Sequence, residues 1–152
     1  MRIWVDADAA PKDVKDIVAR AALRLEVPTL LVANQRLQTP ANNPYVTALR
    51  VEGGPDVADD HIAREAVPGD LAITADIPLA ARLVEKGVEA LDPRGTLYTT
   101  ENIGERLSVR DFMDQLRSTG VETGGPAAWG EKEKRAFAAA FDRVLARLTR
   151  RR

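Results

Sequence analysis

Cysteine is absent from this chain of 152 residues, and histidine occurs once, as His61. The lack of cysteine excludes disulfides, disulfide-linked partners, thiolate nucleophiles, Cys-ligated zinc and iron–sulfur clusters. A single histidine excludes every site that needs two imidazoles. Any chemistry must therefore come mainly from carboxylates, Lys and Arg side chains, hydroxyl groups and backbone dipoles.

Long apolar runs are also absent. No stretch approaches the roughly 18 apolar residues of a membrane-spanning helix, so we expect no membrane partner. The first residues, Met1 to Asp6, do not resemble a signal peptide, and a cytoplasmic location is expected. A chain of this length, with 45% hydrophobic and 30% charged residues, predicts a single globular domain with one core.

The sequence has no large excess of either charge, because 22 Lys and Arg nearly balance 23 Asp and Glu. This balance excludes a surface that is uniformly basic, as in proteins that grip nucleic acid over their whole surface. It also hides a segregation of charge. From residue 131 onward, eight basic and three acidic residues give a net charge of +5, and the preceding 130 residues, with 14 basic and 20 acidic, carry −6.

Short apolar segments alternate with amphipathic segments along residues 1–92. The predicted strands are 3–5, 28–33, 45–51, 71–74 and 88–91, and the predicted helices are 11–25, 55–67 and 78–86, with a loop at 35–44. This alternation predicts an α/β fold of three layers, α/β/α, with a mostly parallel sheet.

Beyond Asp92 the pattern becomes helical. A helix is predicted from about 101 to 116, then a loop at 123–126, then a last helix from Glu131. The last helix is expected to pack back on the sheet, because one of its faces carries Phe137, Phe141, Val144, Leu145 and Leu148. We therefore expect one domain over 1–152, with an alternating core over 1–92 and a helical part over 93–152.

Aspartates follow two of the predicted strands in a repeated layout. Asp6 and Asp8 come after the first strand, Asp76 comes after the fourth, and in both places a proline opens a helix. Because all strands of a parallel sheet end at one edge, these side chains are expected to share that edge. Asn34 ends the second strand at the same edge.

The predicted helix 55–67 carries a further aspartate on its apolar face. Asp59 lies among Ile62, Ala63 and Ala66 at helical spacing, whereas Asp60 flanks this face and His61 is expected to point to solvent. Burial of an unpaired carboxylate costs on the order of several kcal/mol, so Asp59 needs a partner, a metal or a place at the rim of a cleft.

A divalent metal would relieve the repulsion among carboxylates clustered in this way. Mg²⁺ prefers oxygen ligands and is typically held by one or two carboxylates together with substrate phosphate. In phosphodiester hydrolysis, such ions orient and activate water and stabilise the leaving oxygen. The alternative is structural, because aspartate also caps helices; prolines at the first helical position would then make Ala10 and Ile77 the nominal caps.

Seven segments of the sequence resemble the YaiI/YqxD family of bacterial proteins, over essentially the whole chain. They are VDADAAP (5–11), VANQ (32–35), DVADD (56–60), GDLAITADIPLA (69–80), DPRG (92–95), RDFM (110–113) and TGGP (123–126). The family is largely uncharacterised, and its fold resembles that of the PIN/NYN nucleases, whose acidic residues bind Mg²⁺ or Mn²⁺ and cut RNA. The resemblance implies that Asp6, Asp59 and Asp76 hold the metal.

The resemblance also shows two departures. Members of the family usually have cysteine where this chain has Ala10, so a scheme that needs this thiol fails here. The fourth acid of many PIN nucleases, just beyond the position of Asp76, is not evident. Asp8 and Asp60, the acidic neighbours of Asp6 and Asp59, are particular to the YaiI/YqxD family.

The leading hypothesis is a metal-dependent ribonuclease or related phosphodiesterase, with RNA as partner. Asp8 or Asp60 would orient a water on the metal, and Asn34 and Thr74 would fix the ligands by hydrogen bonds. The basic last helix is one source of the cations that an acidic cleft needs in order to bind RNA. Other candidate phosphate contacts are Lys12, Arg36, Arg82 and Arg94.

Two other functions stay open. Asp6 and Asp8 also resemble the DxD motif of haloacid-dehalogenase-type phosphatases, with Asp6 as nucleophile and Asp8 as acid, although Ala10 stands where that motif has Thr or Val. The other alternative is a non-catalytic module that binds RNA or protein. The sequence does not distinguish an endonuclease from an exonuclease, and it fixes neither the number of metal ions nor the oligomeric state.

Overall fold

The structure is a computed structural model that describes residues 1–120 and 128–150. Within these residues, six strands form one sheet in the order β3-β2-β1-β4-β5-β6. The strands are β1 (Ile3–Asp6), β2 (Thr29–Ala33), β3 (Val46–Arg50), β4 (Leu71–Ile73), β5 (Glu89–Leu91) and β6 (Leu97–Tyr98). The helices are α1 (Lys12–Leu25), α2 (Pro55–Glu65), α3 (Ile77–Lys86), α4 (Ile103–Ser118) and α5 (Glu131–Thr149).

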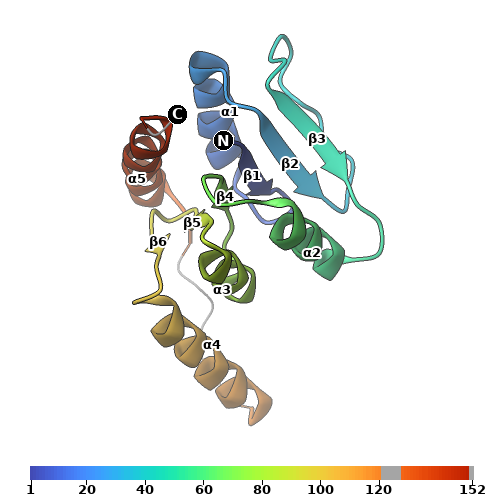
Figure 1. The fold of residues 1–152 in the computed structure, drawn as a ribbon. Helices are drawn as coiled ribbons and strands as arrows, with labels where there is room; N and C mark the ends of the chain where they lie inside the picture. Colours follow the sequence, from blue (N-terminus) through green and yellow to red (C-terminus); the bar gives the residue numbers. More distant parts are fainter. Residues whose placement is uncertain (121–127, 151–152) are drawn as a thin grey trace.

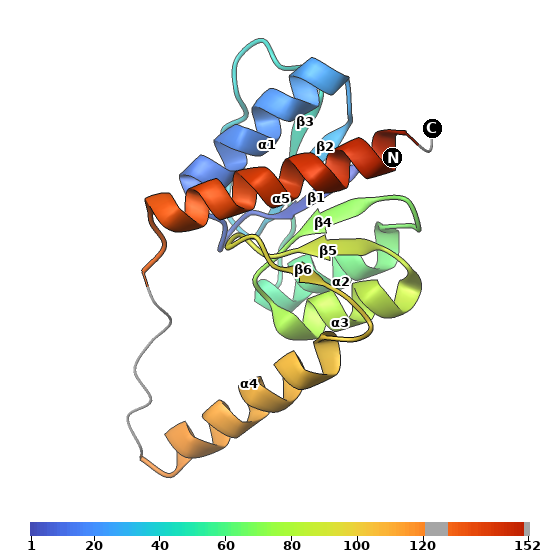
Figure 2. The same cartoon turned by 90° about the vertical axis from the view of Figure 1, so that its left-hand side faces the viewer.

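Helices cover both faces of the sheet (Figure 1). One apolar core joins the sheet to α1 and α5, and a second joins the other face to α2 and α3. The view in Figure 2 shows α5 lying across the sheet beside α1, whereas α4 extends away from the body. The predicted three-layer α/β fold with a mostly parallel sheet is confirmed, and the five apolar residues predicted on the last helix are all buried.

The sequence prediction missed one strand and misplaced two caps. β6 pairs antiparallel with β5, so the part beyond Asp92 is not wholly helical. Helix α3 is capped by Asp76 rather than by Ile77, and Pro11 rather than Ala10 precedes α1. The predicted loop at 123–126 lies outside the described residues.

The prediction that His61 points to solvent was correct only in part. The imidazole is half-buried, and its ring centroid lies 6.0 Å from that of Trp4 in an edge-on arrangement. Helical periodicity places His61 on the flank of α2, but the indole ring of Trp4, on β1, is large enough to contact that flank.

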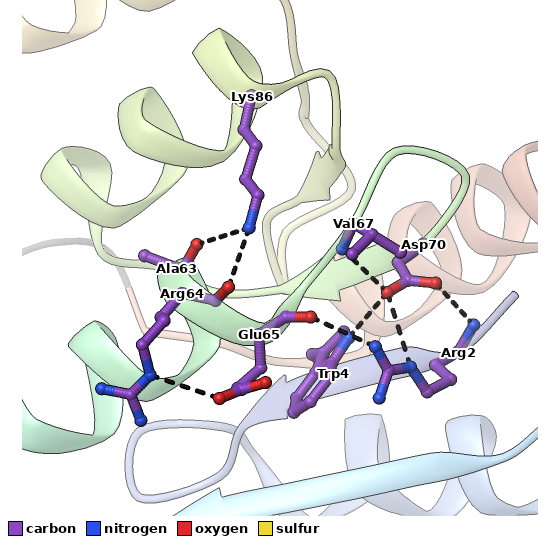
Figure 3. Close-up of polar contacts among 8 residues, drawn as sticks. All are labelled: Arg2, Trp4, Ala63, Arg64, Glu65, Val67, Asp70 and Lys86. Carbon is purple, nitrogen blue, oxygen red and sulfur yellow. Dashed lines mark hydrogen bonds and ion pairs between the residues drawn. The ribbon is translucent and has the colours of Figure 1, made fainter.

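A buried carboxylate holds the amino end of the sheet (Figure 3). Asp70 is 2% exposed and accepts hydrogen bonds from the backbone N–H of Arg2 (2.9 Å), the indole N–H of Trp4 (3.1 Å) and the backbone N–H of Val67 (3.1 Å). The guanidinium of Arg2 lies 4.8 Å from the centre of the Trp4 ring. These contacts fix β1 beside β4, so that the two strands end together at the opposite edge.

Two cations cover the last carbonyl groups of α2, also drawn in Figure 3. Lys86 donates to the carbonyl oxygens of Ala63 (3.2 Å) and Arg64 (2.9 Å), and Arg2 donates to that of Glu65 (3.1 Å). Positive charge at a helix C-terminus is favourable because it meets the negative end of the helix dipole. Helix α2 and its aspartates are thus held firmly against the sheet.

Among the described residues, no helix combines the length and the apolar character that crossing a membrane requires.

Candidate functional site

Three predicted site residues meet where β1 and β4 end. Val5 of β1 lies opposite Ile73 of β4, so Asp6 and Thr74 follow on neighbouring strands. The hydroxyl of Thr74, which is 1% exposed, donates to Oδ2 of Asp6 (3.0 Å) and accepts from the backbone N–H of Asp76 (3.0 Å). Thr74 therefore links the two aspartates.

Asp76 has a structural role as well as a place in the site. Its Oδ1 accepts a hydrogen bond from the backbone N–H of Leu79 (2.9 Å) and so caps α3. Its negative charge also acts on the carboxyl group of Asp59, which projects from α2.

The electrostatic effect of this meeting is largest at Asp59. Burial, together with the negative charges of Asp76 and Asp6, raises the pKa of Asp59 to about 7. The pKa of Asp6 is also raised, mainly by burial, while the hydrogen bond from Thr74 opposes this shift and the charges of Asp76 and Asp8 add to it. The three aspartates form one electrostatic unit, which we call the carboxylate cluster: Asp6, Asp59 and Asp76.

Asp8 and Asn34 pair with each other at the same edge. Oδ2 of Asp8 accepts from the backbone N–H (2.7 Å) and the side-chain amide (3.2 Å) of Asn34. Asn34 therefore orients Asp8 rather than a residue of the carboxylate cluster. Its Oδ1 is the one buried side-chain polar atom of the described residues that lacks a hydrogen-bond partner.

A pocket of about 380 Å³ opens over Asp59 and Asp76, on the side of α2 and α3. Asp60, which is exposed, reaches this pocket and forms an ion pair with Arg82 (2.7 Å). Arg110 enters from α4 and also contacts Asp114 (3.4 Å) and Asp111 (3.8 Å). The lining is Asp56, Asp59, Asp60, Asp76, Pro78, Leu79, Arg82 and Arg110.

The other predicted phosphate contacts lie elsewhere. Lys12 and Arg36 line a second pocket, between α1 and the loop after β2. Arg94 lies in the turn between β5 and β6, where its backbone N–H donates to Asp92. The cations that enter the acidic pocket come from α3 and α4, so the basic last helix does not supply them as expected.

The sequence analysis missed two residues near this edge. Asp92 directly follows β5 and is buried, where its carboxylate accepts from the phenolic hydroxyl of Tyr98 (3.1 Å). Burial and the negative charge of Asp92 raise the pKa of Tyr98. The rule that identified Asp6 also identifies Asp92, because β5 is parallel to β4. Apart from the place of Arg110 in the RDFM segment, nothing in the sequence indicated that this residue lies near the site.

The cluster is not arranged as a closed metal cage. Within residues 1–120 and 128–150, no three Asp, Glu or His side chains are placed to hold an ion together. Thr74 donates a hydrogen bond to one oxygen of Asp6, and the backbone N–H of Leu79 donates one to an oxygen of Asp76.

Fold and site together define an α/β protein with a carboxylate cluster at the carboxyl edge of a mostly parallel sheet. Residues 4–147 match the family described as "Uncharacterized BCR, YaiI/YqxD family", and the chain belongs to this family.

Curated relatives agree with this assignment over nearly their whole length. UPF0178 protein BPP1051 of Bordetella parapertussis is 57% identical over 152 residues, which cover 100% of this chain and 94% of the relative. A UPF0178 protein of Myxococcus xanthus is 55% identical over 150 residues, 99% of this chain and 97% of the relative. No solved structure matches this chain.

Proposed function

We propose that this protein is a Mg²⁺- or Mn²⁺-dependent ribonuclease or related phosphodiesterase with a PIN/NYN-like fold. The observation that carries the proposal is the meeting of three carboxyl groups at one edge of the sheet: Thr74 joins Asp6 and Asp76 by hydrogen bonds of 3.0 Å each, and both charges contribute to the raised pKa of Asp59. Two acids held together in this way destabilise the protein when both are ionised. Such an arrangement is typical of sites built for a cation or for proton transfer.

The donor set suits a hard cation. Every polar group of the cluster presents oxygen, which is the ligand atom that Mg²⁺ prefers. A cage of three carboxylates is not needed, because Mg²⁺ is commonly held by one or two carboxylates and keeps several waters for contacts with substrate phosphate. Asp59 and Asp76 would hold the ion, with Asp6 beside them, and the ion would supply activation of water and stabilisation of the leaving oxygen.

The surrounding residues have separate tasks in this proposal. Thr74 holds Asp6 in place through its hydroxyl group. Asp8, fixed by Asn34 and within electrostatic reach of Asp6, orients the attacking water. Arg82 and Arg110 line the acidic pocket, and their positive charges reduce the repulsion between the pocket and a phosphodiester.

The test is cleavage of an RNA pool at low salt with Mg²⁺ or Mn²⁺. Asp76→Asn is the sharpest variant, because asparagine also caps helices and so preserves α3 while it removes the charge. Cleavage is expected to fall at least about 100-fold in Asp76→Asn and in Asp59→Asn. Asp142→Asn, at an exposed position on α5, is the matched control and should cleave like wild type.

Absence of metal-dependent cleavage by concentrated wild-type protein would overturn the catalytic proposal, as would full activity in Asp76→Asn. The second candidate function, a non-catalytic RNA- or protein-binding module, then takes its place. It is favoured by one observation: Asp60 is already neutralised by Arg82 at 2.7 Å, as in a site that does not need a cation.

A further inference from the structure

A second pocket opens at the same edge of the sheet, on the side of α1. Its volume is about 490 Å³, and its basic residues are Lys12 and Lys15 on α1 and Arg36 on the loop after β2. The rest of the lining, mostly apolar or uncharged, is Asp16, Ala19, Leu31, Leu37, Gln38, Thr39 and Pro40. We call this cavity the basic pocket.

The charges of the basic pocket are not balanced by the protein. Lys12 forms an ion pair with Asp16 (3.0 Å), which is the pocket's one acidic residue. Within the described part of the chain, Lys15 and Arg36 have neither an ion pair nor a side-chain hydrogen bond. Two unpaired cations beside one cavity repel each other, and an anion placed between them removes this repulsion.

The position of the pocket relates it to the carboxylate cluster. Lys12 follows Asp8 by four residues, and Arg36 follows Asn34 by two. The hydrogen bonds between Asp8 and Asn34 tie together the two loops from which these cations come. The basic pocket and the cluster therefore flank this bridge, with the pocket on the α1 side and the cluster toward α2 and α3.

We propose that the basic pocket binds the phosphate backbone of a single-stranded nucleic acid whose neighbouring phosphodiester lies at the carboxylate cluster. Lys15 and Arg36 contact the phosphate, and the apolar walls, Leu31 and Leu37 among them, accept the attached ribose or base. This assignment names the substrate class of the proposed function and rests on it. It also explains how an acidic site holds a polyanion: the cations that attract the strand lie on the segments that follow Asp8 and Asn34.

The experiment is fluorescence anisotropy of a labelled single-stranded RNA of about 20 nucleotides, titrated in EDTA over a range of salt concentrations. Lys15→Glu and Arg36→Glu are each expected to weaken binding about tenfold at low salt and to reduce the slope of log Kd against log salt by about one or more. Lys15→Gln, a milder change, should reduce that slope by about one. Arg143→Glu, an exposed site in the middle of α5, is the control with the same change in charge.

Equal affinities in Lys15→Glu, Arg36→Glu and Arg143→Glu would overturn the proposal, as would the absence of RNA binding by the wild type. A loss confined to the binding of a nucleoside monophosphate, with unchanged affinity for the RNA, would also overturn it, because the pocket would then serve a free small molecule. Because EDTA removes divalent ions, this test is independent of catalysis. Failure of the proposed function appears instead as absent metal-dependent cleavage with the pocket-dependent RNA binding intact.

Discussion

Asp59 illustrates at the scale of one residue how neighbouring carboxyl groups cost stability. Its carboxyl group lies beside those of Asp76 and Asp6, and its pKa is raised to about 7. A group whose pKa is higher in the folded state than in the unfolded state stabilises the fold while it is protonated. That contribution is lost as the pH rises through the folded-state value.

The apo protein should therefore become less stable between about pH 4 and pH 7 because of this residue. Asp59→Asn removes the ionisation, so in EDTA we expect the variant to gain stability over wild type as the pH rises. After allowance for solvent screening, the gain at about pH 8 should be about 1 kcal/mol, or about 3 °C in Tm. Thermal unfolding at several pH values measures it, and a difference that is constant with pH would contradict the assignment.

Asp70 shows the opposite case, a buried carboxylate that is fully satisfied. Asp70→Ala leaves three N–H donors without the acceptor of their buried or part-buried hydrogen bonds, those of Arg2, Trp4 and Val67. We expect a loss of about 3 kcal/mol in the free energy of unfolding, measured by denaturant titration. Glu65→Ala, which removes only an exposed ion pair with Arg64, should change it by less than about 1 kcal/mol. Equal losses in both variants would show that the amino edge is not held by Asp70.

At the scale of elements, the turn between β5 and β6 packs directly on α5. Gly95 has φ +93°, and a Cβ atom there would lie 2.7 Å from both the carbonyl carbon and the carbonyl oxygen of Ala136. Backbone atoms of a packed helix cannot yield as the end of a flexible side chain can. The close approach, together with the left-handed conformation, explains why glycine occupies this position.

Gly95→Ala is accordingly expected to destabilise the protein by about 2–4 kcal/mol. Gly69→Ala is the matched control: its φ is +98°, but no atom lies within 4 Å of the added Cβ. Backbone strain alone should cost about 1 kcal/mol there. Denaturant unfolding of both variants separates the steric contribution from the conformational one, and equal losses would contradict the close packing of the turn on α5.

The elements that the sequence predicts well are those with a clear period. Five strands and all five helices were found, because each parallel strand is a buried apolar run and each amphipathic helix presents one apolar stripe. β6 was missed since two residues, Leu97 and Tyr98, carry no period. The cap of α3 was misplaced because Pro78 occupies the second helical position and Asp76 reaches past it to Leu79.

The site was predictable to the extent that topology determines it. Parallel strands bring Asp6 and Asp76 to one edge, and helical spacing turns Asp59 toward them. Side-chain partners were not predictable, since they depend on the packing of neighbouring elements: Asn34 holds Asp8, and Arg82 neutralises Asp60. Asp92 was overlooked although the same strand-end rule applies to it.

Over the whole molecule, acidic and basic residues gather on separate surfaces, although the chain is nearly neutral. The acidic pocket lies toward α2 and α3, and the basic pocket lies beside α1. Two cations of the last helix are engaged in ion pairs, Lys134 with Asp13 (3.7 Å) and Arg147 with Glu89 (2.6 Å). The positive charge of α5 therefore contributes to its docking on the body as well as to the surface charge.

Calorimetric titration of the protein with Mn²⁺ at about pH 7.5 tests the central claim, that the carboxylate cluster is a divalent-cation site, most directly. We expect saturable binding to wild type and to Asp142→Asn, and affinity lower by at least about tenfold in Asp59→Asn and Asp76→Asn, because each loses an anionic oxygen ligand. Absence of binding by wild type, or unchanged affinity in Asp76→Asn, would contradict the claim.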